Sequence, residues 1–424
     1  MKVAVIGTGI AGNVAAYHLA QKHDITVYEA NSHIGGHTHT HDIDWEGKRY
    51  AIDTGFIVFN YWTYPNFTRL LEELGVEVQA SNMSFSVKCE KTGLEYNGTS
   101  LNSLFAQRRN FLKPSFYRMI GDILRFNREA PKLLQTDGEE ISLGDYLQEG
   151  GYGRAFIEHY IVPMGSAIWS ADPAQMHKFP ARFFIRFFHN HGMLNVDDRP
   201  TWYVIKGGSR EYVEKLIDGY RDRIRLNSRV ISVKRLDGHV EIKTAEQPAE
   251  KFDYVFIAGH SDQALKMLTD PTQAEREILG AIPYQKNEAI LHADASLLPK
   301  RRLAWAAWNY HVLPEYQGRA ALTYNMNILQ GLSSDTPFCV TLNHTDAIDE
   351  SRIIKRMEYD HPVFTQEGIA AQTRHSEING AKRTYYCGAY WRNGFHEDGV
   401  VSALDALRDF EEHVDAQLHI RRAS

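Results

Sequence analysis

The first 29 residues constrain the fold more than any other part of the chain. Residues 3–6 form a short apolar run typical of a buried strand, and apolar residues then recur at helical spacing over residues 10–19. Between these runs lie Gly7, Gly9 and Gly12, in the order Gly-x-Gly-x-x-Gly. The change of period at glycines predicts a strand, a tight turn and a helix that begins at the turn.

This turn predicts a phosphate-binding site. The glycines permit the turn, let the backbone approach a pyrophosphate, and let the helix pack closely on the strand, while the helix N-terminus supplies amide donors. Glu29 ends a second apolar run, where its carboxylate would accept hydrogen bonds from ribose hydroxyls. The order of strand, helix, strand and acid predicts a Rossmann-type dinucleotide-binding unit, and the acid argues against a ribose that carries a 2′-phosphate.

A histidine run follows closely. His37, His39 and His41 occupy alternate positions after Gly35 and Gly36, and alternate side chains of a strand share one face. Three imidazoles on one face are typical of a metal site. Because a zinc site would not require the preceding glycines, we favour a segment that passes the dinucleotide and expect no metal here.

Three segments resemble the superfamily of flavin amine oxidases, protoporphyrinogen oxidases and phytoene desaturases. In EANSHIGGHTHT, residues 29–40, the acid and the glycine pair match the family turn, but His37 stands where the family usually has Arg. YAIDTGFIVF, residues 50–59, resembles the Asp-x-Gly turn that passes the flavin. RTYYCGAYWRNGFHEDGVVSALDALRDF, residues 383–410, resembles the C-terminal motif, whose helix, expected from about Gly399, points at the isoalloxazine.

Two middle segments fit the same resemblance. In the second, residues 225–265, paired strands are expected to turn at Asp237-Gly238, and the resemblance implies that backbone at Val230 meets the adenine. The first lies nearer the N-terminus. WYVIKGGSREYVEKL, residues 202–216, resembles the Gly-Gly turn of the family, with Ser209 as the expected helix cap. The resemblance implies FAD as cofactor. The implied FAD-binding residues are Gly7, Gly9, Ile10, Ala11, Gly12, Glu29, Gly35, Gly36, His37, Thr38, Asp53, Thr54, Gly55, Phe56, Val230, Gly259, Gly388, Trp391, Asp398, Gly399 and Val400.

The matching segments divide the chain into two interleaved domains. We predict an α/β fold with a glutathione reductase-like, Rossmann-type FAD-binding domain formed by residues 1–75, 200–270 and 380–424. Residues 76–199 and 271–379 would form an α+β substrate domain. No second Gly-x-Gly-x-x-Gly lies between a strand and a helix, so we expect no separate nicotinamide domain, and the electron acceptor stays open among oxygen, a quinone and a carrier.

The charge and the cysteine content of the chain limit which partners and which compartment are expected. The net charge of -6, without a recognisable nucleic-acid module, argues against nucleic acid as a partner. Three cysteines without a Cys-x-x-Cys pair, and a start on a strand-like run, favour the cytoplasm. Cys387 precedes the C-terminal glycine loop, where we favour a buried thiol over a thioether to the cofactor.

Residues 103–126 place basic residues beside an apolar face. This pattern suits peripheral contact with an anionic membrane, at the inner face of the cell membrane for a cytoplasmic protein. The alternative is an ordinary solvated helix pair that breaks at Pro114.

The aromatic content of the substrate segments favours an uncharged, elongated substrate. LHADASLLPKRRLAWAAWNYH, residues 291–311, GSAIWS, residues 165–170, and the C-terminal motif are similar to a bacterial branch of these flavoproteins. That branch is implicated in fatty-acyl modification, including flavin-dependent desaturation in furan fatty acid synthesis. The residues that carry this resemblance are Trp305, Trp308, Asn309, Tyr310, Trp391 and His396.

The leading functional hypothesis is an FAD-dependent oxidoreductase that desaturates a fatty-acyl or lipid substrate. Flavin N5 would accept a hydride while a base, His37 or His396, takes the proton, with Tyr310 as a further catalytic candidate. The alternatives are a flavin amine oxidase, for which Lys286 is the candidate for the lysine that the family places near N5, a redox-neutral isomerase, and a flavin-binding partner without turnover.

Overall fold

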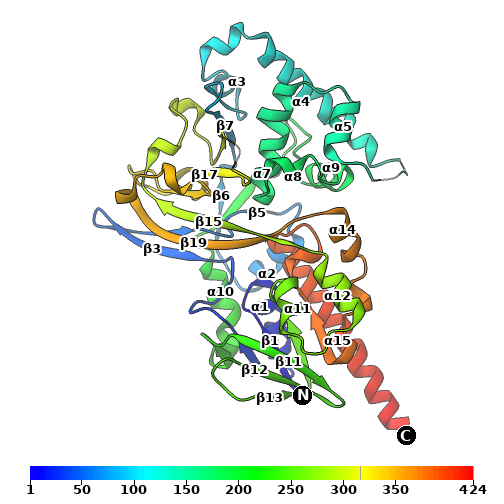
Figure 1. Cartoon of the computed structure of the whole chain (residues 1–424). Coiled ribbons are helices and arrows are strands. Elements are labelled where there is room, and N and C mark those ends of the chain that lie inside the picture. The colour runs from blue at the N-terminus through cyan, green and yellow to red at the C-terminus, as the bar shows by residue number, and fades with distance from the viewer. Residues whose placement is uncertain (137, 139, 316, 424) are drawn as a thin grey trace.

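A five-stranded parallel sheet forms the lower half of the molecule (Figure 1). The computed structural model describes residues 1–136, 138, 140–315 and 317–423, with side chains through residue 416. Every neighbouring pair in this sheet is parallel. The strands run in the order β10 (Ile224–Arg225), β2 (Asp24–Tyr28), β1 (Lys2–Ile6), β14 (Tyr254–Ile257) and β20 (Thr384–Tyr386).

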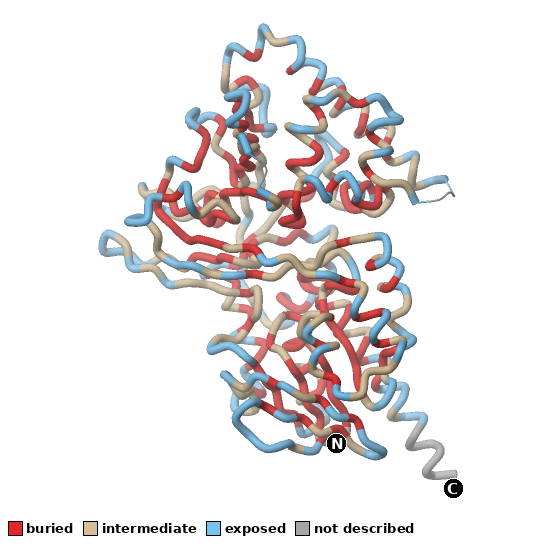
Figure 2. The backbone as a smooth tube through the Cα atoms, viewed as in Figure 1, coloured by how far each residue is buried: buried red, intermediate tan, exposed pale blue. Residues whose placement is uncertain are grey.

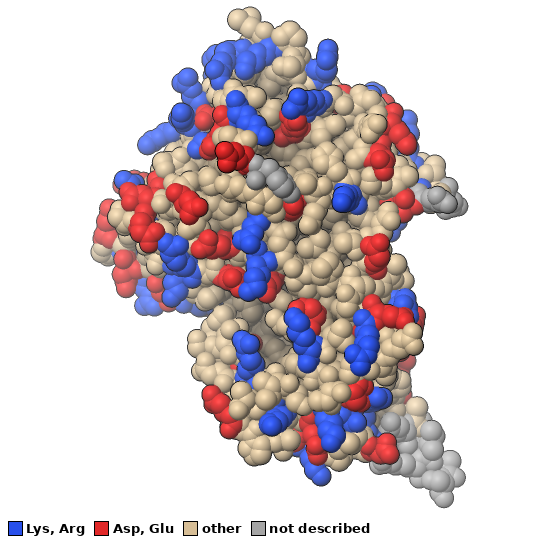
Figure 3. Space-filling view, viewed as in Figure 1, with Lys and Arg blue, Asp and Glu red and all other residues tan. Residues whose placement is uncertain are grey.

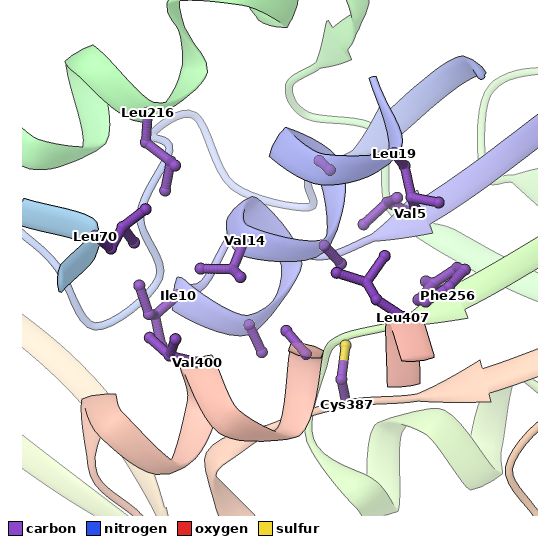
Figure 4. Packing of buried hydrophobic residues seen from close by; sticks show 14 of the residues in the cluster. Val5, Ile10, Val14, Leu19, Leu70, Leu216, Phe256, Cys387, Val400 and Leu407 are labelled. Atoms are coloured by element: carbon purple, nitrogen blue, oxygen red, sulfur yellow. The ribbon is translucent and has the colours of Figure 1, made fainter. Parts of the chain in front are cut away.

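Alternation along β1 buries both faces of this sheet. Val3 and Val5 belong to one apolar cluster, and Ala4 and Ile6 belong to another. The first cluster is covered by helices, with Val14, Leu407 and Phe256 pointing into it (Figure 4). The covering helices are α1 (Ile10–Leu19), α2 (Pro65–Glu73), α10 (Arg210–Ile217) and α15 (His396–Ala423).

The opposite face is covered by a small antiparallel sheet and two helices, and the first two strands of this sheet are joined by the turn at Asp237-Gly238. These elements are β11 (Val230–Leu236), β12 (His239–Thr244), β13 (Glu250–Phe252), α11 (Ser261–Met267) and α12 (Gln273–Gly280), with α14 (Gln366–Gln372) against α12.

A seven-stranded sheet forms the second half of the molecule. Neighbours in it are antiparallel, except for β16 and β7, which run parallel. The order is β19 (Ile353–Pro362), β15 (Tyr284–His292), β18 (Cys339–Leu342), β17 (Ala321–Asn325), β16 (Trp308–Val312), β7 (Phe85–Cys89) and β8 (Leu94–Asn97).

Helices pack on the β7–β8 end of this sheet around a core rich in aromatic residues, which include Phe126, Phe156, Phe184 and Phe188. Figure 2 shows buried segments in both halves of the molecule, and the residues of this core form a different apolar cluster from the one that packs on α1. The helices are α3 (Leu101–Leu104), α4 (Pro114–Leu133), α5 (Leu143–Glu149), α6 (Arg154–Phe156), α7 (Val162–Trp169), α8 (Pro173–Met176) and α9 (Ala181–Asn190), and α13 (Met326–Leu329) follows β17.

Two small sheets lie between the halves. The hairpin of β3 (Thr40–Trp45) and β4 (Lys48–Asp53) carries the histidine run into the seven-stranded part, and β5 (Phe59–Asn60), β9 (Trp202–Ile205) and β6 (Val78–Ser81) form the other. β6 lies beyond the expected domain boundary at residue 75 yet pairs with β9, which lies within the expected cofactor domain.

The α/β class with a Rossmann-type unit is confirmed. One helix begins earlier than expected: α15 starts at His396 rather than near Gly399, because the Asp398 carboxylate accepts the Phe395 amide and caps the extra turn. Among the described helices, none is long and apolar enough to cross a membrane.

A buried ion pair fixes β11 to α12. The Glu275 carboxylate accepts from Arg235 Nη2 at 2.9 Å and from the Tyr386 hydroxyl at 2.6 Å, with both charged side chains at most 1% exposed. Arg235→Leu leaves Glu275 buried without its cation, so we expect the free energy of unfolding in urea to fall by about 3–5 kcal/mol.

The matched control is Arg374→Leu, because the Arg374 side chain is 39% exposed in its pairs with glutamates. Its expected loss is at most about 1 kcal/mol. Equal losses for the two variants would contradict the role assigned to Arg235.

Candidate functional site

The Gly-x-Gly-x-x-Gly turn forms an open notch at the N-terminus of α1. A Cβ atom added to Gly9 meets no atom within 4 Å, whereas one added to Gly12 would lie 2.0 Å from the Gly7 carbonyl oxygen. Gly36 lies on the other side of the notch, where an added Cβ would stand 3.0 Å from Gly9 Cα. Gly9 caps α1 without a side-chain hydrogen bond. The first amides of α1 therefore face a space that suits phosphate.

Glu29 lies beside this notch, almost fully buried. Its carboxylate accepts from the Thr8 amide at 3.0 Å, the Thr8 hydroxyl at 2.5 Å and the Asn31 amide at 2.8 Å. The Ser228 amide donates to the Glu29 carbonyl at 2.7 Å, which brings the start of β11, with Val230, toward the same edge of the sheet. The structure thus brings the expected ribose and adenine residues close to the notch.

Asp53 has a structural role that the sequence did not indicate. Its carboxylate accepts from the Thr40 hydroxyl at 2.6 Å, the Ser209 hydroxyl at 2.7 Å, the Ser209 amide at 2.9 Å and Gln330 Nε2 at 3.0 Å. We therefore assign Asp53 to holding the β3–β4 hairpin against the turn before α10, in place of the expected contact with the cofactor. Ser209 stands at the expected N-cap position of α10, but its hydroxyl donates to Asp53 and does not bond the helix.

The Asp-x-Gly turn, residues 53–56, packs directly on the turn that carries His37. A Cβ atom on Gly55 would lie 2.1 Å from the His37 carbonyl oxygen, and the Phe56 amide donates to that oxygen at 2.7 Å. Thr54 donates to the His39 carbonyl at 3.1 Å. Only glycine at position 55 allows this approach, so the two motifs form one unit.

His396 lies beneath this unit in a polar group that the sequence did not reveal. Its ring stacks on Phe56 at 3.5 Å, and its Nε2 lies 3.0 Å from Thr38 Oγ and 3.1 Å from the Tyr212 hydroxyl. Burial lowers the pKa of His396 to about 3, so the imidazole is neutral at pH 7. The group of Thr38, Tyr212 and His396 connects the GG-His turn with α10 and α15.

His37 lies in a second histidine group. Its ring centroid is 5.3 Å from that of His361, 5.1 Å from Tyr359 and 6.3 Å from His260. Burial, reinforced by the neighbouring imidazoles, lowers the pKa of His37 well below its usual value, although a hydrogen bond with the backbone of Asp360 acts in the opposite direction.

The ring nitrogens of His37 have different surroundings. Its Nε2 is buried and has no hydrogen-bond partner among the described residues, whereas the backbone of Asp360 lies close enough to act on the pKa of the ring. One nitrogen of a neutral imidazole is an acceptor, and Nε2 is the one left free for that role when the other nitrogen faces a carbonyl. An unpaired buried acceptor of this kind fits a bound ligand.

The N-terminus of α15 abuts that of α1. A Cβ atom on Gly399 would lie 2.6 Å from Ile10 Cγ2, and Val400 is buried in the cluster that covers α1 (Figure 4). Asp398 accepts the Phe395 amide at 2.9 Å, and burial raises the pKa of its carboxyl to about 6. Asp398 therefore caps the helix, a role that differs from the expected cofactor contact.

Two glycines that follow β14 and β20, Gly259 and Gly388, lie at the same edge of the parallel sheet. A Cβ on Gly7 would lie 3.4 Å from the Gly259 nitrogen, and the Gly388 amide donates to Ser402 Oγ of α15 at 2.9 Å. Cys387 points into the core beside Phe256 and Leu407, where burial raises the pKa of its thiol to about 12 (Figure 4). Its placement is that of the favoured buried thiol.

Three expected residues lie apart from the two histidine groups. Trp391 stacks on His375 at 4.1 Å and packs on the face of the sheet opposite α1. Tyr310 packs with Ala167 and Leu322 in the seven-stranded half, apart from both histidine groups. Lys286 is wrong as the lysine near N5, because its side chain is 66% exposed and pairs with Glu358 at 2.7 Å.

The described residues hold no group of three or more metal-ligating side chains placed to bind an ion. His39 instead stacks on His33 at 4.0 Å, and its ring is tilted by 48° to that of His41 at 4.1 Å.

An uncharged pocket adjoins the second histidine group. His361 lines it, and burial lowers the pKa of His361 to about 4, so this imidazole is also neutral. The Trp169 indole donates to the Asn393 carbonyl at 3.2 Å and thereby ties the pocket to the C-terminal motif. The lining residues are Trp169, Ser170, Ala171, Gln175, Phe179, Gln285, His361, Pro362, Val363 and Phe364.

The sequence model of the flavin containing amine oxidoreductase family matches residues 10–295, about two thirds of the chain. The chain belongs to this family. As a flavin-containing oxidoreductase it uses FAD, and the open notch at Gly9, the fixed Glu29 carboxylate and the N-termini of α1 and α15 fit that cofactor. No curated protein matches the chain in sequence.

Solved structures share this fold. A cyclohexylamine oxidase from Brevibacterium oxydans IH-35A superposes with a TM-score of 0.70 at 14% identity, over 98% of this chain and 99% of that one. A putrescine oxidase bound to putrescine gives 0.69 at 14% identity, over 97% and 99%. A fatty acid isomerase from P. acnes that produces CLA gives 0.68 at 17% identity, over 96% and 98%.

The notch predicts that a substitution at Gly9 weakens cofactor binding without affecting the folding of the protein. Gly9 has φ -63° and free space around it, so Gly9→Ala should leave the thermal unfolding of the apoprotein unchanged. The added methyl would occupy the approach to the phosphates, and we expect FAD to bind about ten-fold or more weakly, measured by flavin fluorescence quenching. Gly219→Ala, also at an open position, serves as the control and should change neither property. Unaltered FAD affinity in Gly9→Ala would contradict the phosphate site.

The buried imidazoles predict a loss of stability at low pH. His37, His361 and His396 have folded-state pKa values below the usual 6.5, so the unfolded chain binds more protons as the pH falls through 6.5. Each contributes about 1.4 kcal/mol per pH unit once the unfolded imidazole is protonated. Asp53 and Asp398, whose carboxyl pKa values burial raises to about 6, offset part of this loss below pH 6.

We therefore expect the free energy of unfolding in urea to decrease from pH 7.5 to pH 5.5. In His361→Phe the free energy of unfolding should depend less steeply on pH, by the contribution of about one proton. His177→Phe, at an exposed position, should keep the slope of the wild type. A slope that is equal in all three proteins would contradict the burial of a neutral His361.

Proposed function

We propose that the protein desaturates an uncharged, elongated acyl chain of a fatty acid or lipid. The observation that carries this proposal is the pocket beside His361, whose described lining contains no Asp, Glu, Lys or Arg. An amine substrate is a cation at neutral pH and would be desolvated in such a pocket without a carboxylate to pair with. The cavity itself holds only about 10 Å³, so an alkyl chain would enter by displacing these side chains, and it would gain from burial against Trp169, Phe179 and Phe364.

His37 is the proposed base. Bound FAD supplies an acceptor for a hydride at N5. His37 Nε2, neutral and unpaired, would take the proton from the neighbouring carbon, so that a carbon–carbon double bond remains in the substrate. His396 does not compete for this role, because its Nε2 is engaged with Thr38 and Tyr212, and we assign it to positioning.

A redox-neutral isomerisation of the same substrate class is the second candidate. The fatty acid isomerase from P. acnes has the same fold, and its substrate class fits an uncharged pocket. Amine oxidation has support from two structural neighbours, but Lys286 lies on the surface and offers no lysine for it.

The decisive experiment mixes the FAD-loaded protein anaerobically with an unsaturated phospholipid, with the corresponding free fatty acid, and with cyclohexylamine and putrescine. Desaturation predicts that a lipid substrate bleaches the oxidised flavin absorbance and gains one double bond per flavin reduced. Bleaching by the amines alone would overturn the proposal. A shifted double bond that forms only after prior reduction, without consumption of an acceptor, would establish isomerisation instead.

The role of His37 predicts a specific pair of phenotypes. His37→Gln should retain FAD yet slow flavin reduction by about 10²–10⁴-fold, because the amide cannot accept the proton. His189→Gln is the control, since His189 is exposed on α9, and its reduction rate should equal that of the wild type. Loss of FAD from His37→Gln would instead assign His37 to cofactor binding, as the family Arg at this position suggests.

A further inference from the structure

One end of the molecule exposes large apolar side chains. Leu112 is 88% exposed and Leu101 is 77% exposed, while Phe111, Tyr117 and Leu303 are 42–49% exposed. Four of these five lie in the segment from α3 to the start of α4, and Leu303 comes from a distant part of the chain. Leucines exposed to this degree gain nothing from the fold of the protein alone.

The backbone presents these side chains on an ordered scaffold. Ser100 and Ser103 form a capping box at the start of α3, and Pro114 occupies the first turn of α4. Phe105 is buried and stacks on Phe111 at 4.1 Å. The positions of this segment that face the core are therefore already filled by buried aromatic rings. Leu101 and Leu112 occupy the opposite side, which faces outward.

A buried carboxylate joins the second segment to the first. Glu95 of β8 is 5% exposed and accepts from the Lys300 amide at 2.9 Å and from the Arg301 amide at 3.0 Å. These bonds hold residues 300–303 against α3. We call the combined surface, residues 98–121 with residues 300–303, the apolar-basic tip.

The charge of the tip has one sign. Residues 98–121 contain no Asp or Glu, and neither do residues 295–314. None of the tip's cations forms an ion pair within the described part of the chain. These cations are Arg108, Arg109, Lys113, Arg118, Lys300, Arg301 and Arg302.

Figure 3 shows Lys and Arg gathered around uncharged atoms at the end of the molecule that carries α3 in Figure 1. This end is opposite the chain termini (Figure 1).

We propose that the apolar-basic tip docks on a bilayer that contains anionic lipids. The cations fit the phosphates of the headgroups, and the leucines reach past them into the acyl region. A protein partner would offer paired acids at fixed positions, but the cations here surround projecting leucines rather than a groove, which matches a fluid, uniformly anionic surface. The inference is independent of the reaction proposed for the pocket.

The test is co-sedimentation of the FAD-loaded protein with vesicles of phosphatidylcholine alone or with an equal part of phosphatidylglycerol. We expect binding to the anionic vesicles that weakens with salt, and little binding to phosphatidylcholine. Leu101→Ser with Leu112→Ser should weaken binding at least ten-fold. Arg108→Gln, Arg109→Gln and Lys113→Gln together should weaken it by about 100-fold.

Matched controls lie elsewhere on the surface. Val196→Ser with Ile231→Ser removes two exposed apolar residues, which are 59% and 47% exposed, and Lys234→Gln, Lys243→Gln and Lys251→Gln remove the same charge from β11 to β13. Both should bind as the wild type does, and all variants should keep their FAD, measured by absorbance. The proposal fails if the tip variants still bind, if the control variants lose as much, or if the leucine variant only dissociates a dimer in the absence of vesicles.

Discussion

The carboxylate of Asp53 is the constraint on which the arrangement of the two halves depends. It ends the β3–β4 hairpin, and it accepts hydrogen bonds from the turn before α10 and from Gln330, which follows α13. Three segments far apart in the sequence thus meet at one buried acceptor. Because Gly55 and the His37 carbonyl are in contact two residues further on, this acceptor also sets where the GG-His turn lies relative to α10 and α15.

Much of the cofactor-binding half could be predicted from the sequence because its signals are local. The strand, the glycine turn and the helix at residues 2–19 follow from a change of period at fixed glycines, and Glu29 follows at the end of the next strand. The C-terminal glycine loop and helix were found in the same way, with the start of the helix misplaced because the cap supplied by Asp398 carries no periodic signal.

The rest of the site could not be predicted, because ordinary residues become special only through tertiary contact. Tyr212 occupies a normal buried position of a helix, and His361 lies near the end of a long strand, yet one bonds His396 and the other faces His37. The errors have the same origin. The Ser209 hydroxyl donates to a partner 156 positions away in the sequence. Lys286 lies on β15, and the pairing of this strand with β19 decides which of its side chains face outward.

The notch at Gly9 has a consequence for how the protein can change by mutation. Its walls are backbone contacts, of Gly7 with Gly12 and of Gly9 with Gly36, so the shape of the phosphate site does not depend on the surrounding side chains. Most substitutions elsewhere therefore leave this site as it is, whereas any side chain at Gly12 would meet backbone. The substrate side can accordingly diverge in sequence while the recognition of the cofactor phosphates stays the same.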